Sequence, residues 1–185
     1  MTATTGAGDD RTATEWLASA ALDPEACLRA WESDPLGVVL LPAGRVWDVL
    51  VLGGELGRLT LEVLYGVLDR PGPVLADADE SRIGFLVPPG TAAHWIGTGV
   101  RGAGNGTWIV VPRPDVTSGS VHWLVPPDSS GTLSDPVLLE LAMHEAAVRL
   151  SARSRERDAA PPAEATGGMT ERGAGETERG GVEEG

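Results

Sequence analysis

The chain has 185 residues, which suits one domain with its own hydrophobic core and is too short to expect two. Its formal net charge of −13 argues against tight nonspecific binding to a phosphate backbone, because such affinity comes from cationic side chains. The single cysteine, Cys27, excludes a disulfide framework and a cysteine-rich metal site, and we expect it to be a buried, inert thiol. No apolar run approaches the ~20 residues that span a bilayer, and residues 1–10 lack the features of a signal peptide, so we expect no membrane partner and a cytoplasmic location.

Composition divides the chain into three parts. We predict a flexible N-terminus at 1–11, a folded domain at 12–157 and a disordered acidic tail at 158–185. The tail consists of Pro, Gly, Ala, Thr and Glu with almost nothing bulky, and its seven acidic residues against two arginines leave it at −5. The remaining −8 belongs to the first 157 residues, so the domain is acidic as well.

The first half of the domain predicts three helices and two strands. Helices at 12–20 and 24–33 follow from a threonine and an Asp-Pro pair at their starts. The apolar runs 37–42 and 46–52, joined by Ala-Gly-Arg, predict a strand hairpin. A helix at 55–68 carries one apolar stripe and should pack on the sheet.

The second half predicts four strands, a short helix and a long one. The strands form two hairpins, 73–76 with 84–87 and 107–112 with 120–126. The short helix lies at 91–96, the glycine-rich residues 102–106 form a loop, and the last helix starts at Ser-Asp-Pro and covers 136–157. The whole order predicts one α+β domain with a mainly antiparallel sheet and flanking helices.

A first local pattern lies around one acidic residue. A helix end at 28–35 contains a tryptophan and is followed by the strand pair 37–42 and 46–50, which carries Asp48-Val49-Leu50.

A second pattern follows later in the chain. The glycine-rich segment 99–106, with the sequence GVRGAGNG, leads into a strand at 107–114 that ends in prolines. A Ser-Gly turn and an aromatic-containing strand follow at 118–124. Together the two patterns resemble the bifunctional primase-polymerase domain, a branch of the archaeo-eukaryotic primase superfamily, over residues 23–128.

That resemblance implies a primase-polymerase-like fold and a metal-dependent nucleotidyl transfer site. Such chemistry needs several carboxylates that hold two Mg²⁺ ions ~3.5 to 4 Å apart. Of the four family residues only Asp48 is kept: the second acid falls at Leu50, the nucleotide-contacting histidine near Ile83 and the third acid at Gly99. We therefore expect a degenerate pseudoenzyme with no catalytic residues and no cofactor, with Mg²⁺ bound only if the site is retained.

Several residues remain binding candidates, and each has a structural alternative. Asp48 is a metal ligand if Asp77 or Asp79 replaces the lost acids, and otherwise a hydrogen-bonded carboxylate near a strand edge. His122 is a ligand or base, or else a surface or satisfied core histidine.

The glycine-rich segment and the tryptophans supply the other candidates. Residues 102–106 bring backbone close to a nucleotide or partner, with Arg101 supplying charge, or are a flexible connection. Of the six tryptophans, Trp95 is the one expected to offer a stacking surface, and the other five are expected in the core. The nucleotide- or nucleic-acid-binding candidates are Asp48, Trp95, Arg101, Gly102, Gly104, Gly106 and His122. Of these, Asp48, Arg101, His122 and the loop 102–106 are expected to line one cleft.

Two functions follow. The first is a DNA primase/polymerase-like binding or regulatory module in DNA replication, whose partner is a nucleotide, single-stranded DNA or a replication-associated protein. The second is a protein–protein interaction module with no nucleic-acid role, whose acidic surface meets a basic protein. A still-active primase with rearranged acids is a third alternative.

Overall fold

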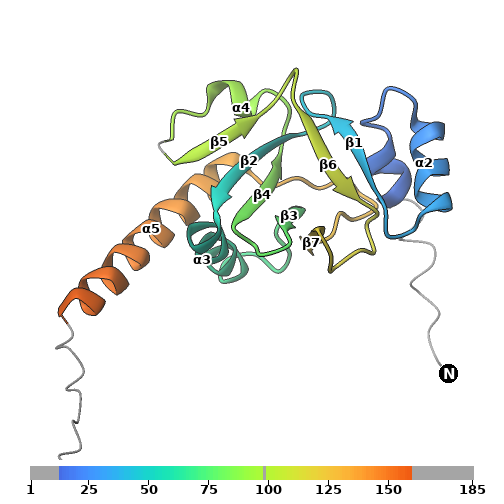
Figure 1. Ribbon diagram of the computed structural model, residues 1–185. Helices are drawn as coiled ribbons and strands as arrows, with labels where there is room; N and C mark the ends of the chain where they lie inside the picture. Colours follow the sequence, from blue (N-terminus) through green and yellow to red (C-terminus); the bar gives the residue numbers. More distant parts are fainter. Residues whose placement is uncertain (1–12, 98, 160–185) are drawn as a thin grey trace, which may run out of the picture.

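A five-stranded antiparallel sheet forms the centre of the computed structural model, which describes residues 13–97 and 99–159. Its strands are β2 (Asp48–Gly53), β3 (Val74–Asp77), β4 (Arg82–Val87), β5 (Val100–Ala103) and β7 (Val121–Val125). They lie in the order β5-β2-β4-β3-β7, and every neighbouring pair is antiparallel (Figure 1). The predicted N-terminal segment 1–11, and the tail from residue 160 onward, lie outside the described residues.

A second, two-stranded antiparallel sheet packs beside the first. It pairs β1 (Val38–Pro42) with β6 (Trp108–Pro112), and we call it the ribbon. The inward side chains of the ribbon join the core, because Leu41 and Val111 are buried against the central sheet. The ribbon is therefore an outer layer over one face of that sheet (Figure 1).

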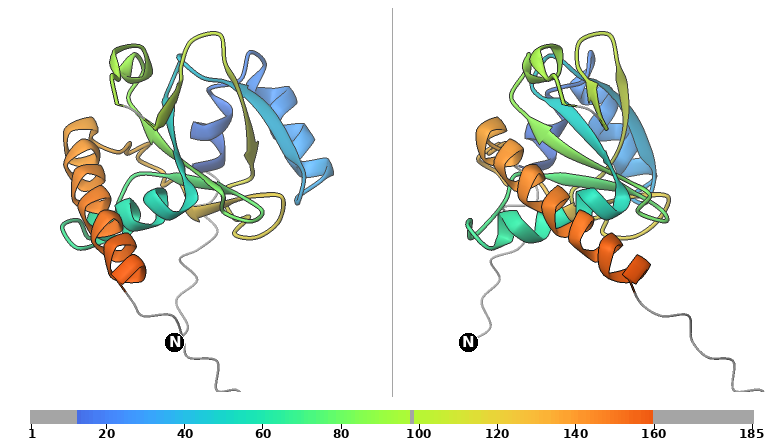
Figure 2. Two further views of the ribbon diagram at one scale, coloured as in Figure 1. Left: turned by 60° about the vertical axis from the view of Figure 1, so that its left-hand side comes forward. Right: turned by 90° about the vertical axis from the view of Figure 1, so that its left-hand side faces the viewer.

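Helices complete both sides. They are a short helix at 13–18, then α2 (Pro24–Ser33), α3 (Gly54–Tyr65), α4 (Thr91–His94) and α5 (Pro136–Ala159). α3 and α5 cover one face of the central sheet, and the N-terminal helices lie with the ribbon on the other (Figure 2). No described helix has the length and apolar character needed to cross a membrane.

The core consists of two apolar layers, one on each face of the central sheet. The layer under α3 and α5 includes Leu50, Ile83, Phe85, Leu64 and Leu139. The layer under the ribbon and the N-terminal helices includes Val49, Leu86, Trp123, Trp31, Leu41, Trp47 and Val111. Alternate residues of β2 therefore serve opposite layers, as the two-residue period of a strand requires. The predicted single α+β domain with a mainly antiparallel sheet and flanking helices is confirmed.

Helix starts follow the sequence signals closely. Asp23 accepts a hydrogen bond from the Ala26 amide at 2.9 Å, with Pro24 as the first helical residue of α2. Asp135 accepts from the amides of Val137 and Leu138 at the start of α5. α5 extends to Ala159, so it includes the first two residues that the sequence assigned to the tail.

Cys27 is buried in the layer under the ribbon. Burial disfavours the charged thiolate and raises the pKa of this thiol to about 11. The expected buried thiol is confirmed.

Strand pairing differs from the prediction in two places. The hairpin predicted for 37–42 and 46–52 is wrong, because β1 pairs with β6 and the connection carries the chain from the ribbon to the central sheet. The hairpin predicted for 107–112 and 120–126 is wrong as well, because β7 pairs with β3. The connection from β6 to β7 instead supplies carbonyl groups to Trp123, whose amide donates to the Val116 carbonyl and whose indole donates to the Arg113 carbonyl at 3.1 Å.

The structure also contains a strand that the sequence analysis missed. β5 includes Gly102, so the predicted loop at 102–106 is wrong in its first two residues and only 104–106 form the turn to β6. A Cβ at Gly102 would lie 2.9 Å from the Ala92 carbonyl oxygen. Glycine is therefore needed there because α4 packs directly on the strand backbone.

Candidate functional site

Asp48 is a buried carboxylate that links β2 to α4. Its side chain is 1% exposed, and Oδ2 accepts a hydrogen bond from the Ala92 amide at 2.9 Å. Oδ1 is buried and has no hydrogen-bond partner within the described residues. Of the two alternatives, the hydrogen-bonded carboxylate is the one the structure contains, although β2 is an inner strand and Asp48 lies at its start rather than at a sheet edge.

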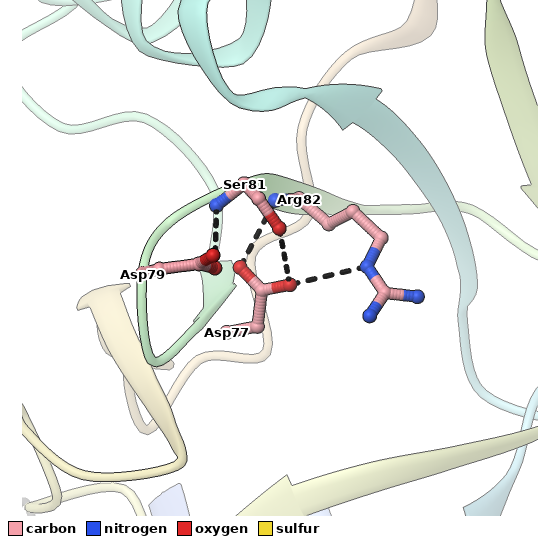
Figure 3. Close-up of polar contacts among 4 residues, drawn as sticks. All are labelled: Asp77, Asp79, Ser81 and Arg82. Carbon is pink, nitrogen blue, oxygen red and sulfur yellow. Dashed lines mark hydrogen bonds and ion pairs between the residues drawn. The ribbon is translucent and has the colours of Figure 1, made fainter.

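Asp77 ends β3 and Asp79 lies in the turn from β3 to β4, and both side chains stabilise that turn (Figure 3). Asp77 accepts hydrogen bonds from the Ser81 hydroxyl, the Arg82 amide and the Arg82 guanidinium at 3.0 to 3.1 Å. Partial desolvation acts to raise the pKa of Asp77, but the hydrogen bonds from Arg82 and Ser81 outweigh it and the pKa is lowered. Asp79 accepts from the Ser81 amide at 3.1 Å.

This turn is far from Asp48. Arg82 pairs with Gly53 and Val87 pairs with Asp48, so the turn and Asp48 lie at opposite ends of β2. The two ends, Asp48 and Gly53, are five positions apart along the strand, which is about 17 Å. The predicted metal site of Asp48 with Asp77 or Asp79 is therefore wrong. The described residues contain no group of three His, Cys, Asp or Glu that could hold a metal ion.

His122 lies on β7, opposite Ala76 of β3. Its Nε2 is 4.0 Å from the Glu80 carboxylate, and its buried Nδ1 has no partner among the described residues. Glu80 also pairs with Arg58 at 2.8 Å. This histidine shares a sheet face with Asp48, but β7 is three strands away from β2. Across the sheet, His122 is level with Leu52, which lies toward the other end of β2 from Asp48.

Arg101 lies on the opposite face of the sheet from Asp48. It pairs with Val51, and Val51 points away from the face that carries Asp48 and Leu50 because side chains alternate along a strand. Arg101 is exposed there. The prediction that Asp48, Arg101 and His122 line one cleft is wrong, so they form no common nucleotide site.

The glycines nearest Asp48 allow close packing. A Cβ at Gly104 would lie 3.3 Å from Asp48 Oδ2, and the Cβ positions of both Gly102 and Gly104 lie against Ala92 of α4. Gly106 has a φ of +86° in the turn to β6, with open space around it. These contacts assign Gly102 and Gly104 a packing role, and their predicted ligand role stays a prediction.

The tryptophans divide by position. Trp31, Trp47 and Trp123 are fully buried, and Trp16 is half-buried against the same layer. Trp108 is 52% exposed, so the prediction that it belongs to the core is wrong. Trp95 follows α4, is half-buried and lines a groove beside α5.

The ribbon carries a feature that the sequence analysis missed. Its outer side carries the large apolar side chains Val38, Leu40, Trp108 and Val110, and Leu36 lies in the turn that precedes β1. These five side chains are 39% to 81% exposed and are here called the ribbon face. Leu40 of β1 lies opposite Val110 of β6 in the register. Val38 is two residues from Leu40 on β1, and Trp108 is two residues from Val110 on β6. They are contiguous because residues two apart on paired strands share a face.

Acidic residues lie at one end of the ribbon face. Glu32 and Asp34 precede Leu36 in sequence, and both are exposed. The Asp34 carboxylate lies against Gly37, where a Cβ would be 2.7 Å from its Oδ2. Neither carboxylate forms an ion pair with another described residue. The ribbon face therefore combines an apolar centre with negative charge at its edge.

No protein-family model, no curated protein and no solved structure matches the chain.

Proposed function

We propose that the chain is a noncatalytic binding protein that recognises a partner protein through the ribbon face. The observation that carries this proposal is a patch of four exposed apolar side chains on paired strands, Val38, Leu40, Trp108 and Val110, with Leu36 exposed in the turn before β1. Folded proteins that act alone rarely leave such a patch open to water, and exposed apolar patches rimmed by polar groups mark binding surfaces. An exposed tryptophan at the patch is the residue type that most often dominates binding energy.

The charge of the molecule supports a partner with basic residues. Asp34 and Glu32 lie at one end of the ribbon face, and the whole chain carries −13. Charge complementarity raises association rates and disfavours acidic partners. We therefore propose a partner segment with an apolar centre flanked by lysine or arginine.

The test is selection of peptides from a random library displayed on phage, followed by calorimetry with the purified chain. Enriched peptides are expected to combine apolar and basic residues. Leu40→Ser and Trp108→Ser should each weaken binding about tenfold or more, as expected for central anchor residues. Val148→Ser, which changes a residue of α5 that is 64% exposed, is the matched control and should leave binding unchanged.

Three results would overturn the proposal. One is the absence of any enriched peptide, and another is equal loss of binding in the Val148→Ser control. The third is a concentration-dependent dimer, seen by analytical ultracentrifugation, that Leu40→Ser dissociates, because the ribbon face would then bind a second copy.

The relationship to primase-polymerase domains is a second proposal, and the sequence patterns around Asp48 and residues 99–124 support it. Asp48 is engaged with the Ala92 amide, and one carboxylate does not neutralise two divalent ions and a triphosphate. We therefore expect no oligonucleotide synthesis from Mg²⁺ or Mn²⁺, nucleotides and a primed or unprimed template. Template-dependent incorporation that Asp48→Asn removes would contradict this and restore a polymerase.

A further inference from the structure

A groove of about 550 Å³ lies between α5 and the segment that follows α4. Its principal lining residues are Leu56, His94, Trp95, Glu140, Met143 and His144. A smaller hollow of about 290 Å³ shares His94, Trp95 and Glu140 with it and extends to the start of α5. In both views of Figure 2, α4 lies above the start of α5. The volume of the groove alone is in the range of small-molecule sites, ~300 to 1,000 Å³.

The floor of the groove is apolar. Leu56 comes from α3, Met143 from α5 and Trp95 from the end of α4, and all three are half-buried. The Trp95 indole Nε1 is buried without a hydrogen-bond partner among the described residues. An indole ring and a thioether are surfaces that favour an apolar or aromatic group.

The rim of the groove accepts hydrogen bonds and carries negative charge. His94 Nδ1 is 2.9 Å from the Gly90 carbonyl oxygen, which only accepts, so Nδ1 bears the proton and Nε2 of the neutral ring is an acceptor. Glu140 and His144 are four residues apart and share one side of α5. Glu140 forms no ion pair with a described residue, and no arginine lines the groove.

We propose that this groove binds a small organic cation with an apolar or aromatic body, such as an amine or a guanidinium compound. The cation pairs with the Glu140 carboxylate, and the body packs on Trp95 and Met143. The negative charge of Glu140 disfavours anions of the same shape. Cation–π attraction by the indole adds to the preference for a cation.

A hydrogen bond to Asp48 contributes to the position of α4 beside this groove. The Asp48 carboxylate holds the Ala92 amide at the start of α4, three residues before Trp95. Asp48 is therefore a positioning residue for the groove, although it does not line it.

The experiment follows the six tryptophan indole N–H signals by ¹H–¹⁵N NMR during titration with 2-phenylethylamine. The signal of Trp95, assigned with Trp95→Phe, is expected to shift in a saturable manner while the signals of Trp31, Trp47 and Trp123 stay in place. The anion 3-phenylpropionate, of similar size, should produce no saturable shift. Glu140→Gln should weaken amine binding about fivefold, the effect of one partly exposed ion pair.

Glu62→Gln on α3 is the matched control, because it removes the same charge from an exposed helical position outside the groove. It should retain the affinity of the unchanged chain, and circular dichroism checks that both variants are folded. The proposal is overturned if the carboxylate shifts the Trp95 signal as the amine does, or if both glutamine variants lose affinity equally. A shift with Zn²⁺ alone and none with the amine would overturn it as well.

Discussion

The two sheets are built from strands of similar composition but differ in how they are covered. β2 has the sequence DVLVLG and β1 the sequence VVLLP. Leu50 and Leu52 of β2 are at most 1% exposed, whereas Leu40 of β1 is 60% exposed. An apolar run therefore predicts a strand, but it does not say whether one face or both faces of that strand are covered.

The layer order explains the difference. The central sheet has α3 and α5 on one face and the ribbon with the N-terminal helices on the other. The ribbon covers one face of that sheet with its inner side, whereas the side chains of the ribbon face on its outer side are exposed. Its surplus apolar surface adds nothing to the core, which is why we assign it to binding.

Leu50→Ala and Leu40→Ala give the largest expected contrast between the two sheets. Leu50→Ala removes buried methyl groups from the layer under α3 and α5 and should lower the free energy of unfolding by about 2 to 5 kcal/mol. Leu40→Ala removes side-chain atoms that already contact water, so its effect should stay within about 0.5 kcal/mol. Urea denaturation of both variants measures the difference. Equal losses would show that the ribbon face is covered in solution.

Asp48 gives the next largest effect, at the point where the central sheet meets α4. Asp48→Ala leaves the Ala92 amide without its acceptor, and we expect a loss of about 1 to 3 kcal/mol in the free energy of unfolding. Asp48→Asn keeps an oxygen acceptor and should cost less than about 1 kcal/mol. The two variants are compared by urea denaturation. If they lose the same amount, the charge of Asp48 matters rather than its hydrogen bond.

An ion pair in the connection from β6 to β7 should make a smaller contribution to the free energy of unfolding, and that contribution depends on pH. The Arg113 guanidinium donates to both carboxylate oxygens of Asp115, through Nε at 2.7 Å to Oδ1 and through a second nitrogen to Oδ2. This hydrogen bonding outweighs partial desolvation and lowers the pKa of Asp115. A lowered pKa in the folded state adds stability above the unfolded value of ~3.9, and that stability is lost as pH falls through the folded pKa.

Asp115→Asn should therefore lower the free energy of unfolding at pH 7 by no more than about 1 kcal/mol, because the pair is partly exposed. The difference from the unchanged chain should shrink as pH falls below ~3.9. Urea denaturation at a series of pH values measures it. A difference that stays constant into strong acid would contradict the assigned role of the carboxylate charge.

Local sequence signals predicted most helices and strands. The features that they did not predict depend on packing between segments that are far apart in the sequence. Asp23-Pro24 and Asp135-Pro136 gave the helix starts because a cap acts within its own turn. The pairing of β1 with β6 joins segments about seventy residues apart, and no local signal in either strand names its partner. The sequence does not predict β5, because Gly102 weakens the strand pattern. The glycine is needed for the close contact of β5 with Ala92 of α4, which only the folded structure shows.

The candidate site was harder to predict because its contacts also join residues that are far apart in the sequence. Asp48 stood out as an isolated carboxylate in an apolar strand, but its partner, the Ala92 amide, is forty-four residues away. The order of the motifs alone predicts Arg101 beside Asp48. One residue of register decides which face a side chain takes, and that register is fixed by the pairing of Arg101 with Val51. The strand that carries Trp108 is apolar throughout, and this pattern predicts a core position without indicating which face is covered.

The smallest expected effect concerns residues 160–185, which lie outside the described residues. Among them only Met169 and Val182 combine an apolar side chain with more bulk than alanine or proline. Burial of so little apolar surface adds almost nothing to stability, at about 25 cal/mol per Å². Truncation after Ala159, the last residue of α5, should therefore leave the thermal unfolding midpoint unchanged within error in a differential scanning measurement. A clear loss would show that this acidic segment packs on the domain, and the exposed arginines at the end of α5, Arg153 and Arg155, would be the first contacts to test.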